Sequence, residues 1–414
     1  MKHGSKIAGR RLVYAATGIS ALGGLLFGYD IGVISGAILF IKKDFLLSSA
    51  LEEVVVSSVL LGSLAGAAVG GVLADRLGRR KLLIVTALVF GAGAVGAALA
   101  AGTAWLVVAR VVAGAAIGVA SFVSPLYISE IAPVEIRGKL VSINQVALTS
   151  PRWLLGRGHT NEARTVLKRI RVPGRVEGEL TEIRGGLAQQ KGRWSELFSP
   201  LLRPAMIVGV GLAVAQQITG INTVIYYAPT ILKFAGLSSA SVAILASVGV
   251  GVVNLVLTLV AMQLIDRVGR RPLLLASLGG MALSLFALGL AFSLPQLASH
   301  LGLFAVTGLM AYVGCFAVGL GPVFWLLLSE IYPLRIRGRA MSVATVVNWS
   351  ANLLVASSFL TLTRLLGKAY TFWSYAAVST GAWIFAFFFV PETKGRSLEE
   401  IEAHWRAGKH ARDF

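Results

Sequence analysis

Asp75-Arg-Leu-Gly-Arg-Arg80 follows one long apolar run of this 414-residue sequence, and Asp266-Arg-Val-Gly-Arg-Arg271 follows another. A second matched pair also follows apolar runs: Ser129-Glu-Ile-Ala-Pro-Val-Glu-Ile-Arg-Gly-Lys139 and Ser329-Glu-Ile-Tyr-Pro-Leu-Arg-Ile-Arg-Gly-Arg339. Charged loops that recur at corresponding helix ends are typical of two homologous halves of a membrane transporter. The alternative is that these loops only anchor helices at the inner surface, and four matched copies disfavour it.

The apolar runs predict an all-α polytopic membrane protein. The chain is 56% hydrophobic and 14% charged, with a mean hydropathy of +0.77. About 20 apolar residues are enough to cross a bilayer as a helix. Ten runs reach that length: 12–41, 54–74, 82–102, 104–128, 205–235, 240–265, 272–294, 299–328, 340–363 and 370–391.

The net charge of +19 reports membrane orientation. If both termini are cytoplasmic, the charged loops and the long segment 151–203 face inward, as the positive-inside rule requires. The expected location is therefore the plasma or inner membrane, and nucleic acid is not expected as a partner. The first run is too long for the core of a cleaved signal peptide, so it is expected to be retained. Only a few basic residues would lie outside: Lys42, Lys43, Lys233, Arg364 and Lys368.

Polar side chains interrupt the run 205–235 at Gln216-Gln217-Ile218-Thr219-Gly220-Ile221-Asn222. Each unpaired polar group in hydrocarbon costs several kcal/mol, so these side chains need partners. On one continuous helix Gln217 and Asn222 would lie roughly 140° apart, which makes a wide polar face. Amides both donate and accept hydrogen bonds, which suits a neutral polyhydroxylated ligand. Hydrogen bonding between helices is the alternative interpretation.

Two charged residues lie within apolar runs. Asp30 follows the inner start of its run by about 18 residues, and Arg110 lies near the outer end of the run 104–128, so both fall in the outer half of the bilayer. An ion pair between them is therefore expected. A carboxylate there can bind or release a proton when either its burial or its distance from the arginine changes. A static buried pair is the alternative.

The motifs together resemble the sugar porter branch of the major facilitator superfamily. The resemblance rests on the repeated loops, the Gln-Gln-x-x-Gly-x-Asn stretch and four further segments that occur in the family's order: Phe27-Gly-Tyr-Asp30, Pro151-Arg-Trp-Leu154, Gly321-Pro-Val-Phe-Trp325 and Pro391-Glu-Thr-Lys-Gly-Arg396. It covers about residues 12 to 401 and implies a major facilitator fold with two pseudo-repeated helical halves. It also implies transport of a monosaccharide or polyol by alternating access, with proton symport.

The chain departs from the family at residue 150. Leu140-Val-Ser-Ile-Asn-Gln-Val-Ala-Leu-Thr-Ser150 begins a fifth helix, but Pro151 follows at once, where the family has already completed its sixth. Roughly 50 to 70 residues are therefore missing, which leaves about ten spans instead of twelve. The expected division is an N-terminal half over 1–150, a cytoplasmic helical loop over 151–203, a six-helix half over 204–391 and a cytoplasmic tail over 392–414.

The resemblance also implies roles for particular residues. Asp30 matches the protonation site and Arg110 its partner. The residues that match the family's sugar-binding set are Gln145, Gln216, Gln217, Asn222, Asn254, Trp325, Asn348 and Asn352. Tyr226 and Tyr227 match the outer gate, although aromatic residues at a membrane interface have an equally simple explanation. The inner network of charges that pairs the two halves is matched by Asp75, Arg79, Glu130, Arg137, Asp266, Arg270, Glu330, Arg337 and Glu392.

These expectations describe a carrier and not an enzyme. No cofactor and no metal are expected, Cys315 is the single cysteine, and no phosphate-binding loop suggests the use of ATP. The expected partners are a small neutral sugar or polyol, a proton and the lipid bilayer, and the sequence indicates no particular oligomeric state. Two alternatives stay open. One is a proton-independent sugar facilitator, and the other is a sugar-binding receptor or defective remnant that does not transport.

Overall fold

The computed structural model describes residues 28, 30, 32–131, 160, 161, 164, 177, 178, 194–237, 239–333, 336–396, 400 and 401. Each regular element in these residues is an α-helix or a short 3₁₀ helix, which confirms the all-α class. Eight helices of this part are long and apolar enough to cross a membrane, or up to nine with one bent pair. Residues 12–27 of the first expected span lie outside the described residues.

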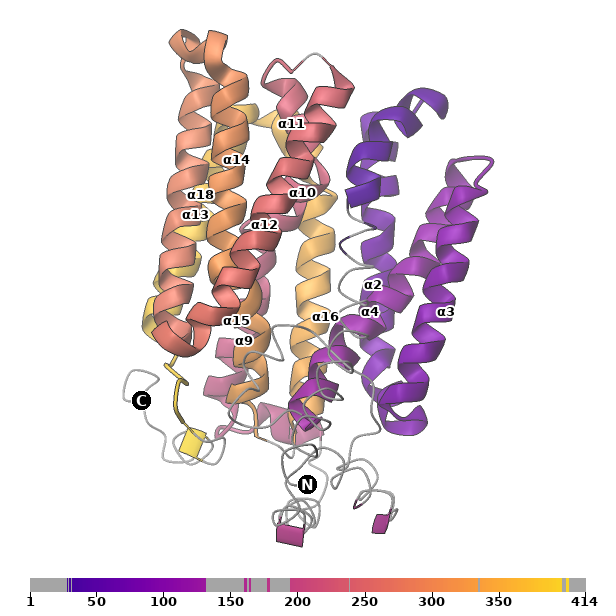
Figure 1. Ribbon diagram of the computed structural model, residues 1–414, viewed down its shortest axis with the longest axis vertical. Helices are drawn as coiled ribbons and strands as arrows, with labels where there is room; N and C mark the ends of the chain where they lie inside the picture. The colour runs from indigo at the N-terminus through magenta and orange to yellow at the C-terminus, as the bar shows by residue number, and fades with distance from the viewer. Residues whose placement is uncertain are drawn as a thin grey trace, which may run out of the picture.

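The first half of the chain contributes a helical segment over residues 32–44 and three long helices. These are α2 (Ser49–Leu77), α3 (Arg79–Ala98) and α4 (Thr103–Ile131). Figure 1 shows them grouped on one side of the molecule. A Cβ at Gly114 or Gly118 of α4 would collide with the backbone of Val59 or Ser63 in α2. The two backbones therefore pack in direct contact, as small residues spaced by four permit in membranes.

The second half contributes the remaining long helices, which form the other group in Figure 1. Several of its apolar runs are divided into two or three shorter helices. The elements are η3 (Trp194–Phe198), α9 (Arg203–Ile218), α10 (Ile221–Tyr226), α11 (Ala228–Phe234), α12 (Ala240–Val268), α13 (Arg270–Ser293), η4 (Pro295–His300), α14 (Leu301–Val318), α15 (Leu320–Ile331), α16 (Arg337–Ala356), α17 (Phe359–Leu365) and α18 (Lys368–Phe389).

The expected continuous helix over 205–235 is wrong in one respect, since the run divides into α9, α10 and α11. Gly220 has a φ of 91°, a left-handed conformation that only glycine adopts without strain, and it ends the α9 geometry. The run 340–363 likewise divides into α16 and α17, which are bent by 41°. The breaks free backbone groups inside the membrane, and such breaks are tolerated where protein surrounds them.

The repeated loops adopt the same backbone turn in both halves. Gly78 joins α2 to α3 with φ 81° and ψ 150°, and Gly269 joins α12 to α13 with φ 111° and ψ 166°. The shared glycine of the two Asp-Arg-x-Gly-Arg-Arg segments therefore provides the positive φ that reverses the chain. This agreement supports the interpretation of the sequence as a duplicated unit.

The two groups of helices meet along α16, which packs against both α2 and α4 (Figure 1). One hydrogen bond across this boundary runs from Trp349 Nε1 to Ser121 Oγ, at 3.1 Å. Helix α16 also packs on α9. It therefore touches both halves and lies beside the polar stretch at the end of α9.

Candidate functional site

Four amide side chains form a hydrogen-bonded cluster where α9 faces α16. Gln217 Nε2 donates to Asn348 Oδ1 at 3.0 Å and to Gln216 Oε1 at 3.2 Å. Asn348 Nδ2 donates to Gln216 Oε1 at 2.7 Å and to the backbone oxygen of Ala213 at 3.1 Å. Asn222 Nδ2 donates to Gln217 Oε1 at 2.9 Å. The structure therefore joins four of the eight expected sugar-site residues into one neutral network.

The break between α9 and α10 brings Asn222 back to Gln217. The expectation that the two side chains lie roughly 140° apart on one helix is therefore wrong, because the chain turns at Thr219 and Gly220 between them. The turn is held by Tyr312, whose hydroxyl donates to the backbone oxygen of Thr219 at 2.8 Å. The polar residues thus gather at a helix break instead of spreading around a helix.

Asn352 lies one helical turn beyond Asn348 on α16 and is buried, with 1% of its surface exposed. Its Nδ2 has no hydrogen-bond partner among the described residues, and neither does the hydroxyl of buried Tyr226. The two side chains are neighbours, and Tyr226 is also within electrostatic range of Asp30 and Arg110. Buried polar atoms without partners are rare, so these two are candidates to bond each other, a ligand or water.

Asp30 and Arg110 form the expected ion pair, with 3.4 Å between Oδ1 and Nη1. Arg110 is buried in α4 and also donates from Nε to the backbone oxygen of Val55 at 2.9 Å. Asp30 Oδ2 has no hydrogen-bond partner among the described residues. Arg110 is therefore held by a hydrogen bond to α2, while one oxygen of the Asp30 carboxylate is available for another partner.

The other expected sugar-site residues are not part of the amide cluster. Asn254 in α12 lines a cavity of about 440 Å³ between residues 28–36 and α12, together with Ser35, Ser247 and Gly251. Trp325 in α15 is half-buried and packs edge-on against Phe324, with 4.7 Å between ring centroids. Gln145 lies outside the described residues.

Tyr227, the second expected gate residue, is fully buried between α10 and α11. Its hydroxyl donates to the backbone oxygen of Ala356 at 3.3 Å, and its ring stacks on Phe359 with centroids 5.1 Å apart. Tyr227 therefore holds the bend between α16 and α17. Its neighbour Tyr226 faces the region of the ion pair instead.

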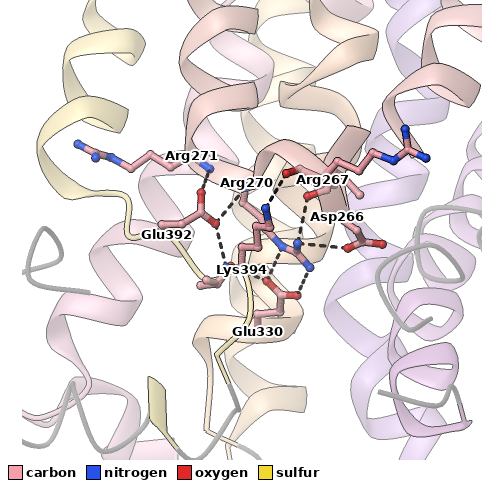
Figure 2. Close-up of polar contacts among 9 residues, drawn as sticks. Asp266, Arg267, Arg270, Arg271, Glu330, Glu392 and Lys394 are labelled. Carbon is pink, nitrogen blue, oxygen red and sulfur yellow. Dashed lines mark hydrogen bonds and ion pairs between the residues drawn. The ribbon is translucent and has the colours of Figure 1, made fainter. Parts of the chain in front are cut away.

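Four of the nine expected inner-network charges meet within the second half (Figure 2). The guanidinium of Arg270 lies between Asp266, at 3.2 Å, and Glu330, whose carboxylate receives two bonds at 2.9 and 3.2 Å. Glu392 accepts the backbone N–H groups of Arg270 and Arg271 at 3.0 and 3.1 Å. The network ties α12, α13, α15 and the segment after α18 together.

The described contacts of the remaining network residues do not show whether these charges pair the two halves. Arg337 begins α16 and donates from Nε to the backbone oxygen of Tyr332 at 3.1 Å. Asp75, Arg79 and Glu130 lie on described helices, but their side chains fall outside the described part of the structure. Arg137 lies outside it altogether. Pairing of the two halves by these charges stays a prediction.

Sequence reasoning missed two polar contacts between the halves. Glu53 in α2 bonds Thr361 in α17, and Trp349 in α16 bonds Ser121 in α4. For Glu53 a signal existed, because an acidic residue directly precedes the apolar run 54–74. Trp349 and Ser121 carry no such signal, since each is an ordinary residue of an apolar helix.

Known proteins resemble this chain along most of its length. The chain matches the family described as "Sugar (and other) transporter" over residues 16–150 and 149–405. It is 37% identical to the D-xylose transporter of Levilactobacillus brevis, over 94% of each chain. It is 36% identical to the galactose-proton symporter of Escherichia coli K12, over 96% of this chain and 95% of that one.

Among solved structures, the proton:xylose symporter XylE bound to 6-bromo-6-deoxy-D-glucose has a TM-score of 0.84. The two chains are 33% identical over 96% of this one and 99% of that one. The two sequence alignments above span 432 and 441 residues, which exceeds the 414 residues of this chain. The relatives therefore carry residues that have no counterpart here, and the family match divides where helices five and six are expected to be shortened.

Proposed function

This chain belongs to the sugar porter family of the major facilitator superfamily, and we propose that it carries a monosaccharide or polyol across the membrane by alternating access, together with a proton. The amide cluster carries the proposal. Gln216, Gln217, Asn222 and Asn348 present donors and acceptors without net charge, buried at a helix break. A sugar hydroxyl both donates and accepts, so it can replace any one of these bonds without leaving a charge unpaired.

Proton coupling is supported by the Asp30–Arg110 pair and by two relatives whose names state a proton as cosubstrate. Arg110 makes a second bond to α2, so it stays in place when Asp30 binds a proton. A protonated Asp30 no longer attracts Arg110, which changes how the first helix is held. Tyr226 is near this pair and its neighbour Asn352 is one helical turn from Asn348, so a change at one site can reach the other.

The chain is a multi-pass membrane protein of a transporter family. We place it in the plasma or inner membrane with both termini in the cytoplasm, because its basic loops would then face inward. The loops at 75–80 and 266–271 lie at the same ends of their helix pairs, as this orientation requires.

The test is uptake of radiolabelled hexoses, pentoses and polyols into proteoliposomes that contain the purified chain, with and without an inward proton gradient. We expect one substrate to accumulate above its external concentration only when the gradient is present. Protein-free vesicles and an intact twelve-span relative serve as controls. Absence of uptake by this chain, with uptake by the relative, would overturn the proposal. Equal uptake with and without the gradient would exclude proton coupling and support a proton-independent facilitator.

A sugar-binding protein that does not transport is a second candidate, because the relatives carry residues that this chain lacks. It predicts saturable sugar binding in detergent and no uptake into vesicles. Calorimetric titration of the sugars used for uptake separates the two. Binding together with accumulation supports the carrier, whereas binding alone supports the receptor.

A further inference from the structure

Two adjacent carboxylates at the start of α2 are buried but have different partners. Glu52 is 2% exposed and pairs with Lys42, which belongs to the same half of the molecule. Glu53 is 6% exposed and reaches across to the other half. Its Oε1 accepts the backbone N–H of Thr361 at 3.0 Å, and its Oε2 accepts the Thr361 hydroxyl at 3.1 Å.

The contact satisfies groups on both sides. A buried carboxylate is costly unless it is hydrogen-bonded, and Thr361 supplies one donor to each oxygen of Glu53. Thr361 lies in the first turn of α17, where backbone N–H groups have no partner within the helix. Separating α2 from α17 would therefore leave unpaired groups on each, unless water replaces the bonds.

Thr361 follows the bend that divides α16 from α17. Tyr227 contacts the same bend: its hydroxyl bonds the backbone oxygen of Ala356, and its ring stacks on Phe359. Helix α16 precedes the bend and contains Asn348 of the amide cluster. The bend thus links a contact between the halves to the proposed sugar-binding residues.

We propose that Glu53 is a positioning residue of the transport cycle, whose bonds to Thr361 hold the two halves together at the end of the bundle far from the network of Figure 2. The bonds form when that end is closed and part when it opens, while the Glu52–Lys42 pair stays intact throughout. This inference rests on the proposed alternating access. It adds a determinant of closure on α2, close to Tyr227 at the same bend.

Distances between two spin labels test the proposal without any transport assay. The labels are placed on cysteines at Ala50 of α2 and Leu365 of α17, which are both exposed, in a chain with Cys315→Ser. The substrate-free protein in lipid nanodiscs is compared with Glu53→Ala and with the matched control Glu52→Ala. Because two bonds to a charged group are lost, we expect Glu53→Ala to raise the ratio of separated to closed populations about tenfold or more. Glu52→Ala should leave this ratio unchanged.

Two milder variants keep the test valid if Glu53→Ala does not fold. Glu53→Gln retains an oxygen that can accept the Thr361 N–H, and Thr361→Val removes only the hydroxyl donor. Both should give a smaller rise in the separated population than Glu53→Ala. Unchanged distances in all Glu53 and Thr361 variants would overturn the proposal, whether or not the chain transports. A rise in the Glu52 control equal to that in Glu53→Ala would overturn it too.

Discussion

The amide cluster and the Asp30–Arg110 pair are both buried polar sites, but they are built in opposite ways. The cluster is neutral and lies within the second half, and its four side chains bond chiefly to one another. The ion pair lies in the first half, joins two ionisable groups of opposite sign and leaves Asp30 Oδ2 without a hydrogen-bond partner among the described residues. One site can exchange its hydrogen bonds for those of a neutral ligand. The other can change its charge.

The two sites differ in which group can change its state. Arg110 is fixed by the carbonyl of Val55, so Asp30 is the partner whose state can vary. In the cluster, Gln216, Gln217 and Asn348 each keep a partner if one bond is replaced, so no charge needs to move. We therefore propose that sugar recognition and proton binding depend on different residues, and mutations can test this division.

The largest expected effect is that of Asp30→Asn, which makes the charged site neutral like the cluster. The amide side chain cannot deliver a proton, so we expect complete loss of gradient-driven accumulation. Exchange of labelled for unlabelled sugar should persist, because the amide cluster is untouched. Counterflow and accumulation assays in the same vesicles measure the two. Accumulation that survives the substitution would contradict the role of Asp30.

The converse change, Asn348→Asp, places a charge in the neutral cluster. Asn348 Nδ2 donates to Gln216 and to the Ala213 carbonyl, and a carboxylate would oppose both acceptors without a proton to give. Burial of an unpaired charge costs several kcal/mol, so we expect apparent sugar affinity to fall by about 100-fold or more. Ser350→Ala on the exposed side of α16 is the control for disturbance of the helix, and it should bind sugar normally.

A third prediction concerns the packing of α2 against α4, which holds Arg110 in place. Gly118→Ala would push a Cβ into the backbone of Ser63 and part α2 from α4, the helices that hold Val55 and Arg110. Overpacking costs about 1–3 kcal/mol, so the thermal unfolding midpoint should fall. Gly91→Ala in α3, where a Cβ meets nothing within 4 Å, should not lower it. We also expect Gly118→Ala to weaken proton coupling more than sugar binding, and equal losses would count against the separation of tasks.

The smallest expected effect is that of Glu330→Gln in the network of Figure 2. Glu330 accepts two bonds from Arg270 and one from Thr393, at 2.6 Å, but it contacts neither polar site. We expect a few-fold change in maximal transport rate at unchanged sugar affinity, because glutamine keeps an oxygen that can accept a hydrogen bond from Arg270 and only the charge is lost. Asp266→Asn should do less, since Asp266 is 43% exposed and solvent screens it.

Much of the fold follows from the sequence, because its signals are local. The two Asp-Arg-x-Gly-Arg-Arg segments predict a duplicated turn, and Gly78 and Gly269 both adopt the positive φ that such a turn needs. Long apolar runs predict the spans, and the family match and the all-helical structure confirm the class. The break at Thr219 and Gly220 was not predicted, since a glycine within an apolar run is usually compatible with a continuous helix.

The candidate site is only partly predictable for a different reason. Gln216, Gln217 and Asn222 are close in sequence, so their conspicuous polarity revealed them. Which residues complete their bonds depends on packing, and Asn348 joins the cluster whereas Asn254 lines a separate cavity. The Glu53–Thr361 contact joins residues 308 positions apart, and no local pattern predicts such a pair.

We propose that a neutral amide site binds the sugar while Asp30 carries the proton. The most direct test is the pH inside weakly buffered proteoliposomes when sugar is added outside. We expect sugar to acidify the lumen of vesicles with the unmodified chain, and we expect Asp30→Asn to take up sugar down its gradient without acidification. Sugar uptake that acidifies the lumen equally in both would contradict it.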